Sequence, residues 1–295
     1  MDKLTLDSYA KLNLYLSVLG ARPDHYHNIL TIFERISLAD KIILQARIDN
    51  KINLICKEKG LPKDPSQNLA YKSAKLLQES FKINKGADIE IIKNIPIGSG
   101  LAGGSSNAAY TLIGLNKLWR LNLKQAQLAE LAVKIGSDVP FFIYNSSFAR
   151  GEGRGERVKP LKFLKKVKLW HILAVPDLKV STPLIYKKWD EFKDMNMLTM
   201  PKYDVKLLIS GLKKRDYPAL NKAVFNGLES VTMKLCPQVR RVKNRLLSLG
   251  AQSILMSGSG PAVFGIVSSR KKAVTLVRRL KKENSSWRIF FCRTV

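Results

Sequence analysis

The segment at residues 96–107 restricts the possible folds of this chain more than any other part of the sequence. It reads Pro-Ile-Gly-Ser-Gly-Leu-Ala-Gly-Gly-Ser-Ser-Asn and separates a predicted strand, 87–95, from a predicted helix, 107–119. Glycine tolerates positive φ angles and lets the backbone approach a ligand closely. The free N–H groups of a helix N-terminus, which carries about half a positive charge, favour an anion there. The segment therefore predicts a phosphate-binding loop, to which Ser105 and Ser106 add hydroxyl ligands for phosphate or Mg²⁺.

Three classes of nucleotide-binding loop contain such glycines. Gly98, Gly100 and Gly103 match the dinucleotide fingerprint, but that fingerprint needs an acidic residue about 20 positions later for a ribose hydroxyl. Residues 117–127 contain no acid. The Walker P-loop also begins with two glycines at this spacing, but Gly104 stands where its phosphate-binding lysine belongs. The third class, a phosphate loop without lysine, fits best.

The motif at 96–107 resembles the ATP loop of the GHMP kinases, a family that includes galactokinase, homoserine kinase and mevalonate kinase. Two further segments resemble the other motifs of that family. They are Ala-Lys-Leu-Asn-Leu at 10–14 and Met-Ser-Gly-Ser-Gly-Pro-Ala-Val-Phe at 256–264. Because all three occur in the family order and span almost the whole chain, the chain is identified as a member of the GHMP kinases.

The resemblance implies an α+β fold with the two-domain GHMP kinase architecture. Residues 1–160 would form a ribosomal protein S5 domain 2-like N-terminal part that binds ATP. Residues 161–295 would form a ferredoxin-like C-terminal part that binds the substrate. The glycine-rich polar stretch 150–156 is expected to be flexible, and the boundary between the parts to follow it.

Hydrophobic periodicity predicts the helices and strands independently of the family. The predicted strands are 4–19 (with a kink at Ala10 and Lys11), 42–44, 52–55, 87–95, 169–175, 253–256, 263–267 and 287–292. The predicted helices are 68–80, 107–119, 124–135, 239–249 and 272–282, with loops at 59–66 and 98–106. Helices and strands alternate in the second half, as in an α+β sandwich.

Four short segments narrow the resemblance to one subfamily of the GHMP kinases, which acts in non-mevalonate isoprenoid precursor biosynthesis. They lie at 24–27, 68–69, 136–142 and 149–153. The resemblance implies ATP-dependent phosphorylation, with Mg²⁺, of a hydroxyl on a small cytidyl substrate. Two residues depart from the pattern of the subfamily: Tyr9 replaces a usual proline, and His25 replaces a usual glycine.

Phosphoryl transfer depends mainly on positioning and charge stabilisation. By resemblance, Asp138 in Gly-Ser-Asp-Val-Pro is catalytic and takes the proton of the substrate hydroxyl or orients that group. Lys11 would lie beside it, keep it ionised and stabilise charge on the transferred group. A second interpretation stays open, in which Asp138 only caps the helical turn that begins at Val139. Ser137 would suit that capping role equally well.

The resemblance also assigns the binding residues. His27 would recognise the cytosine base, Tyr26 and Tyr186 would surround it, and Asn13 would orient the substrate or Lys11. Core packing is the alternative role for Tyr186. The turn Ser257, Gly258 and Ser259 would lie close to the phosphates or the substrate. The ATP-binding residues would be Asn68 and Leu69 at the adenine pocket, and Pro96, Gly98, Ser99, Gly100, Leu101, Ala102, Gly103, Gly104, Ser105 and Ser106 in the loop.

The composition bears on partners and location. The chain has 51 Lys and Arg against 23 Asp and Glu, a net charge of +28, and such a charge favours anionic ligands. The basic residues are spread in short clusters, so we interpret them as a solvated surface and expect no nucleic acid partner. Neither a secretory signal nor a membrane span is visible, which predicts a cytoplasmic protein. We expect a monomer or a homodimer. Cys56, Cys236 and Cys292 are too widely spaced to suggest a zinc site or a disulfide framework.

Two other functions remain open at this point. Another GHMP small-molecule kinase, of the homoserine or mevalonate type, would share the three motifs but not a cytosine pocket. A basic RNA-binding protein of S5-like fold would share the fold and the charge, and its affinity for RNA would fall steeply with salt. The three motifs together favour the kinase.

Overall fold

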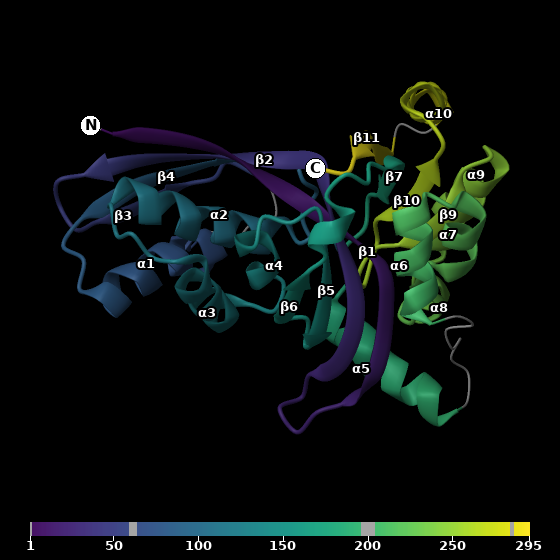
Figure 1. The fold of residues 1–295 in the computed structure, drawn as a ribbon, viewed down its shortest axis with the longest axis horizontal. Coiled ribbons are helices and arrows are strands. Elements are labelled where there is room, and N and C mark those ends of the chain that lie inside the picture. The colour runs from purple at the N-terminus through teal and green to yellow at the C-terminus, as the bar shows by residue number, and fades with distance from the viewer. Residues whose placement is uncertain (1, 59–63, 196–203, 284–285) are drawn as a thin grey trace.

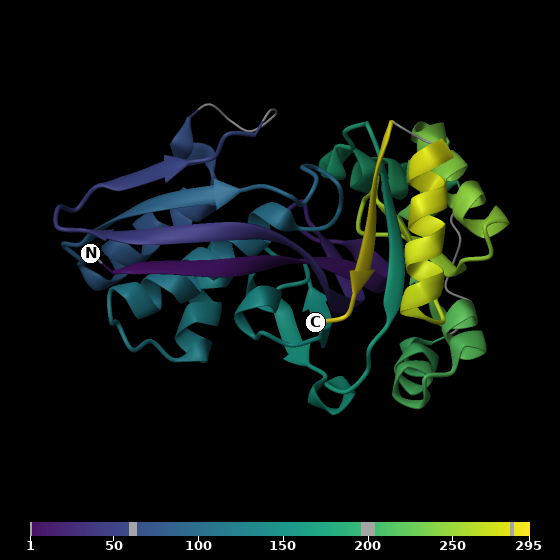
Figure 2. The ribbon, with the colours of Figure 1, turned by 90° about the horizontal axis from the view of Figure 1, so that it is seen from above.

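The structure is a computed structural model of the chain and describes residues 2–58, 64–195, 204–283 and 286–295. Its longest elements are two antiparallel strands, β1 (Lys3–Ala21) and β2 (His27–Arg47), which lie side by side (Figures 1 and 2). The pairing register between them shifts between Tyr9 and Ala10. The irregularity predicted at Ala10 and Lys11 is thereby confirmed, and a β-bulge of this kind re-aims the side chains that follow it.

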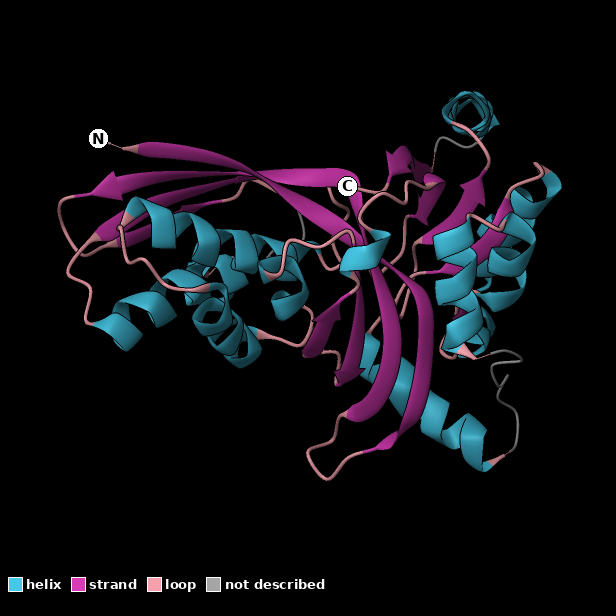
Figure 3. Cartoon of the chain, in the orientation of Figure 1, coloured by secondary structure: helices cyan, strands magenta, loops and turns pink. Residues whose placement is uncertain are grey.

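In the described residues, a seven-stranded sheet is built around this pair in the order β3-β4-β2-β1-β8, with β5 paired to β2 and β6. The added strands are β3 (Ile52–Ile55), β4 (Gly86–Ile92), β5 (Phe148–Gly153), β6 (Arg157–Pro160) and β8 (Phe225–Asn226). Helices cover one face of this sheet (Figure 3): α1 (Leu69–Phe81), α2 (Gly103–Leu118), α3 (Gln125–Ile135) and α4 (Val139–Ile143). Leu44 and Ile89 from the strands pack with Leu112 and Phe141 from the helices in one buried cluster.

A second, antiparallel sheet has the order β11-β7-β10-β9. Its strands are β7 (Trp170–Pro176), β9 (Gln252–Met256), β10 (Val263–Val267) and β11 (Trp287–Arg293). The helices of this half are α5 (Thr182–Asp194), α6 (Val205–Lys214), α7 (Tyr217–Ala223), α8 (Glu229–Leu235), α9 (Pro237–Ser248) and α10 (Arg270–Glu283). The predicted α+β class is confirmed, as are the elements predicted from residue 239 onward. Measured over the described residues, every helix falls short of the length and apolarity that a membrane crossing requires.

The two sheets share a hydrophobic cluster, so their relative placement is fixed by packing. Leu12 and Leu14 of β1 belong to the same buried cluster as Leu164, Leu173 and Phe264 from the second half of the chain. The strand β8 also returns from the second half to pair with β1. The boundary predicted after residue 160 falls at the end of β6 and stays a prediction.

The prediction of a flexible stretch at 150–156 is wrong. Most of these residues belong to β5 and pair with β2, where Gly151 lies opposite Thr31. A Cβ atom at Gly151 would meet the ring of Phe33 at 2.6 Å, so glycine allows the two strands to pack closely. The glycines and charges suggested a loop because the sequence does not reveal this close strand partner.

Candidate active site

A cleft of about 890 Å³ is lined by residues from β1, β2, the glycine loop, the segment before α4, the helix α5 and the turn after β9. Leu101, Ser106 and Ser257 are buried and lie outside the lining. The structure brings the other predicted site residues together around the cleft: Lys11, Asn13, Tyr26, His27, Asn68, Leu69, Pro96, Gly98, Ser99, Gly100, Ala102, Gly103, Gly104, Ser105, Asp138, Tyr186, Gly258 and Ser259.

The glycine loop is shorter than predicted because α2 begins at Gly103 and not at residue 107. The chain turns through positive φ at Gly98 and Gly100 (65° and 79°), and then at Ala102 (54°), which is the N-cap of α2. No side chain forms a capping hydrogen bond at this helix end. The first N–H groups of α2 are therefore free to meet an anion, and the small residues of its first turn leave them accessible.

Ser257 joins the three sequence motifs rather than facing the cleft. Its hydroxyl accepts a hydrogen bond from the backbone N–H of Asn13 (3.3 Å) and donates one to the carbonyl of Gly100 (3.1 Å). A Cβ atom at Gly100 would overlap the carbonyl oxygen of Ser257, so only glycine allows this approach. The third motif therefore fixes the glycine loop against β1.

Ser106 also has a structural position. Its hydroxyl donates to the carbonyl oxygen of Tyr9 (2.6 Å) and lies 2.7 Å from the hydroxyl of Ser8, both on β1. The side chain is buried and bonded to β1, and the use of its hydroxyl as a phosphate or Mg²⁺ ligand stays a prediction. Ser105 lines the cleft and keeps that role as a prediction.

Lys11 and Asp138 come from distant parts of the chain and meet in the cleft. The Lys11 ammonium lies 3.7 Å from Asp138 Oδ2 and donates a hydrogen bond to Asn13 Oδ1 (2.5 Å). Lys11 is 4% exposed, whereas the Asp138 side chain is 33% exposed and open to a substrate. Burial lowers the pKa of Lys11 from its ordinary value of 10.5, and the facing Asp138 carboxylate opposes that change.

The capping interpretation of Asp138 is not supported by the structure. Asp138 is the N-cap residue of α4, but its side chain makes no capping hydrogen bond. A side chain that stabilises a helix end accepts a hydrogen bond from the second or third N–H of the helix. The carboxylate is instead directed to Lys11 and the cleft, where it is available for chemistry.

Aromatic rings gather at the end of the cleft near α5. The ring of His27 lies 4.8 Å from that of Tyr186 at 30°, and 5.8 Å edge-on from that of Trp189. His27 Nε2 is 2.9 Å from Asp190 Oδ1. The sequence analysis missed Asp190 because the acids of this helix form no pattern that marks a site.

The turn before β2 explains one departure from the subfamily pattern. His25 has a φ angle of 61°, a conformation that glycine adopts without strain. Beside it, Tyr26 is 52% exposed, and the guanidinium of Arg154 lies 4.8 Å from its ring centroid. Tyr26 therefore offers an accessible aromatic face at the edge of the cleft.

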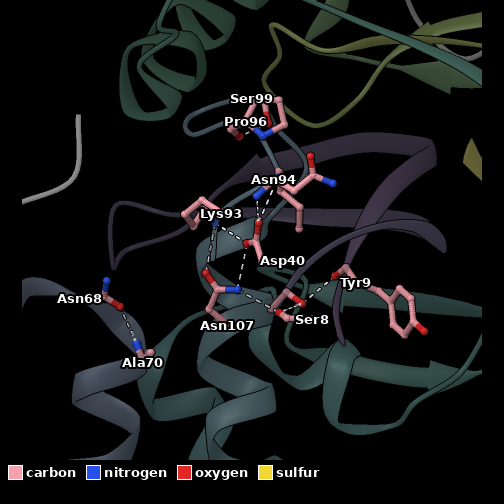
Figure 4. Close-up of polar contacts among 12 residues, drawn as sticks. Ser8, Tyr9, Asp40, Asn68, Ala70, Lys93, Asn94, Pro96, Ser99 and Asn107 are labelled. Carbon is pink, nitrogen blue, oxygen red and sulfur yellow. Dashed lines mark hydrogen bonds and ion pairs between the residues drawn. The ribbon is translucent and has the colours of Figure 1, made fainter. Parts of the chain in front are cut away.

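Asn68 and Leu69 lie at the other end of the cleft, at the start of α1. The side chain of Asn68 accepts a hydrogen bond from the N–H of Ala70 (2.9 Å) and so caps that helix (Figure 4). Lys93 and Asn107 also line the cleft and were missed as site residues. Asn107 lies inside the glycine motif. Its side chain is polar and buried, and this burial, which marks it as a candidate site residue, is visible only in the structure.

No set of three or more His, Cys, Asp or Glu side chains that could hold a metal ion occurs among the described residues. Several residues of the cleft lining carry oxygen donors suited to Mg²⁺, and Ser105 and Asp138 are among them. This agrees with the usual binding of Mg²⁺ by one or two protein oxygens together with substrate phosphates.

Comparison with known sequences gives two domain matches and close relatives. The model of the GHMP kinases N terminal domain matches residues 68–146, and that of the GHMP kinases C terminal domain matches residues 208–286. A Geobacillus sp. (strain WCH70) protein named 4-diphosphocytidyl-2-C-methyl-D-erythritol kinase is 44% identical over 265 residues, 90% of this chain and 88% of that protein. A Bacillus cytotoxicus protein of the same name is 42% identical over 279 residues, 95% of this chain and 93% of that protein.

Comparison with solved structures agrees with the sequence matches. The crystal structure of a 4-(cytidine 5'-diphospho)-2C-methyl-D-erythritol kinase has a TM-score of 0.82 at 31% identity and covers 98% of both chains. A homoserine kinase from Cytophaga hutchinsonii has a TM-score of 0.73 at 18% identity, covering 100% of this chain and 95% of that chain. The second likeness concerns the fold alone.

Proposed function

The chain belongs to the GHMP kinase family, and we propose that it transfers the γ-phosphoryl group of ATP to the 2-hydroxyl of 4-diphosphocytidyl-2-C-methyl-D-erythritol. The products are ADP and the 2-phosphate, in non-mevalonate isoprenoid precursor biosynthesis. One observation carries the proposal: Lys11 and Asp138 are paired at 3.7 Å in the same cleft as the uncapped N-terminus of α2. We place this activity in the cytoplasm, where ATP is available.

In the proposed mechanism, the chain acts mainly by placing groups and charges. The triphosphate lies along the glycine loop, where the N–H groups at the start of α2 face its oxygens. The substrate hydroxyl lies against Asp138, which orients it and takes its proton as the new P–O bond forms. The Lys11 ammonium faces the Asp138 carboxylate and stabilises the charge on the transferred group, and its burial strengthens this effect.

Mg²⁺ would neutralise charge on the phosphates, and Ser105 and Asp138 are among the cleft residues whose oxygens would hold it. The net charge of +28 supplies a positive potential that attracts both polyphosphate ligands to the cleft.

The function is tested by ADP release from the purified protein with Mg-ATP and one of three alcohols: the cytidyl substrate, homoserine or mevalonate. We expect turnover with the cytidyl substrate alone. Turnover with homoserine or mevalonate instead would contradict the proposed substrate and leave the family assignment intact. Failure to release ADP with any of them would contradict the kinase function itself.

Replacing His27 by alanine is expected to raise KM for the cytidyl substrate about 10-fold, because one hydrogen-bonding and stacking partner of the base is lost. KM for ATP should stay unchanged, since His27 lies at the opposite end of the cleft from Asn68. Steady-state kinetics with each substrate varied in turn measures both values. An unchanged KM for the cytidyl substrate in His27→Ala would refute the assigned role.

A further inference from the structure

Asp40 is a buried acid on β2 that lies beside the glycine loop without lining the cleft (Figure 4). It is 1% exposed. Its Oδ1 atom accepts hydrogen bonds from the backbone N–H groups of Asn94 (2.7 Å) and Ile95 (2.8 Å). Its Oδ2 atom pairs with the Lys93 ammonium and accepts from Asn107 Nδ2 (3.0 Å). Both oxygens of the carboxylate therefore have two donors each.

These donors stand on both sides of the glycine loop. Asn94 and Ile95 directly precede Pro96, where the loop begins, and Asn107 lies in the second turn of α2, after the loop ends. One carboxylate thus holds the two ends of the loop to β2. Asn107 extends the connection to β1, because its Nδ2 atom also donates to the hydroxyl of Ser8 (3.0 Å).

The same carboxylate fixes the position of Lys93. The Lys93 ammonium also donates to Asn107 Oδ1 (3.1 Å), and it would lie 3.2 Å from a Cβ atom at Gly103. It is therefore held beside the first turn of α2, at the cleft. Without Asp40 this cation, whose side chain is 7% exposed, would lack its buried charge partner.

Burial of a carboxylate costs free energy unless hydrogen bonds and an opposite charge offset the lost hydration. An apolar side chain would fill the same space without that cost, and replacing buried ion pairs by apolar groups often leaves stability unchanged. Asp40 provides something that packing does not, namely directional bonds to two backbone N–H groups that set the path into the loop. Binding of a phosphoryl group depends on such placement, since displacements of about 1 Å weaken aligned donors strongly.

We propose that Asp40 is a positioning residue for ATP: it holds both ends of the glycine loop and the Lys93 ammonium in the arrangement that receives the triphosphate. The inference rests on the proposed binding of ATP at this loop. Asp40 does not touch the nucleotide and acts through Asn94, Ile95, Lys93 and Asn107.

The test is Asp40→Asn, with each substrate varied in turn in the ADP-release assay. Asparagine keeps one oxygen for the two backbone N–H groups but turns an NH₂ group toward Lys93 and Asn107, which are both donors there. We expect KM for ATP to rise about 10-fold or more, as for loss of a charged hydrogen bond, while KM for the cytidyl substrate stays within about twofold. The matched control is Asp88→Asn, the same change on the neighbouring strand β4 at the surface partner of Arg47, which should change neither value.

The two KM values separate positioning from a merely structural role. Partial unfolding lowers the concentration of active enzyme and hence the apparent kcat, but it does not change KM. An unchanged KM for ATP in Asp40→Asn, or an equal rise for both substrates, would overturn the proposal. If Asp40→Asn does not fold, Asn107→Ala is measured in its place. An unchanged KM for ATP in Asn107→Ala would also overturn the proposal.

Calorimetric titration with Mg-ATP alone gives the same comparison without turnover. A dissociation constant about 10-fold weaker in Asp40→Asn than in the unmodified protein is expected, and an equal one would refute the role of Asp40. Because this measurement needs no acceptor, failure of the proposed substrate and failure of the Asp40 proposal give different results.

Discussion

Replacing Asp138 by asparagine is expected to lower kcat for the cytidyl substrate by about 10²–10⁴-fold. The substitution keeps the size of the side chain but removes the group that accepts the proton and the charge that faces Lys11, 3.7 Å away. The fold should persist, because the Asp138 side chain makes no helix-capping hydrogen bond and is partly exposed. Steady-state ADP release measures kcat, and circular dichroism with thermal unfolding checks the fold.

The matched control for this variant is Asp177→Asn, the same change at an exposed aspartate that lies outside the lining of the cleft. It should retain full activity. Turnover of Asp138→Asn within a few-fold of the unmodified protein would exclude a catalytic role for Asp138. The positioning of ATP by the glycine loop would then have to account for the rate.

Replacing His171 by alanine is expected to destabilise the protein by roughly 3–5 kcal/mol, because it breaks a fully buried pair. His171 Nε2 on β7 lies 2.9 Å from Glu34 Oε1 on β2, and both side chains are 0% exposed. The hydroxyl of Thr294 donates to the same oxygen (2.6 Å), while Glu34 Oε2 has no hydrogen-bond partner in the described part of the chain. Loss of His171 would leave the Glu34 carboxyl group with a single donor in the core. Urea unfolding followed by circular dichroism measures the change in the free energy of unfolding.

The double variant Glu34→Met, His171→Leu serves as the control for this prediction. Two apolar side chains remove the unpaired polar group, so most of the lost stability should return. A double variant as unstable as His171→Ala would contradict the unpaired carboxyl group as the cause, because Glu34→Met removes that group. Because the pair joins the two sheets, its loss should also reduce the cooperativity of unfolding.

The sequence predicted those parts of the molecule that depend on local chemistry. The helix 68–80 and the strand 52–55 follow from the spacing of apolar residues along the chain, and α1 and β3 confirm them. The phosphate loop follows from glycines between a strand and a helix. The sequence missed most of β2, because its central residues are buried on both faces and so show no alternation of apolar and polar side chains.

The candidate site could be named from the sequence mainly through the resemblance to a kinase family. Asp138 had two interpretations that spacing alone could not separate, since an aspartate before Val-Pro suits a helix cap and an active site equally well. The structure shows no capping hydrogen bond from Asp138 and directs its carboxylate to Lys11, which favours the catalytic interpretation. For Ser106 and Ser257 too, only the structure shows the partners of the side chain. Their hydroxyls form buried hydrogen bonds with β1 and with the glycine loop.

The sequence by itself determined most helices and strands and the glycine loop, because glycine conformation and hydrophobic period act between near neighbours in the chain. It indicated the family through the resemblance of three motifs in their order along the chain. Only the tertiary structure decided which partners the polar side chains have. Asp40 and Asn107 are 67 residues apart in sequence, and Glu34 and His171 are 137 apart, yet each pair forms a hydrogen bond. Such contacts depend on how the sheets and helices pack. No local pattern of residues encodes that packing, so the positions of these buried polar side chains were visible only in the folded chain.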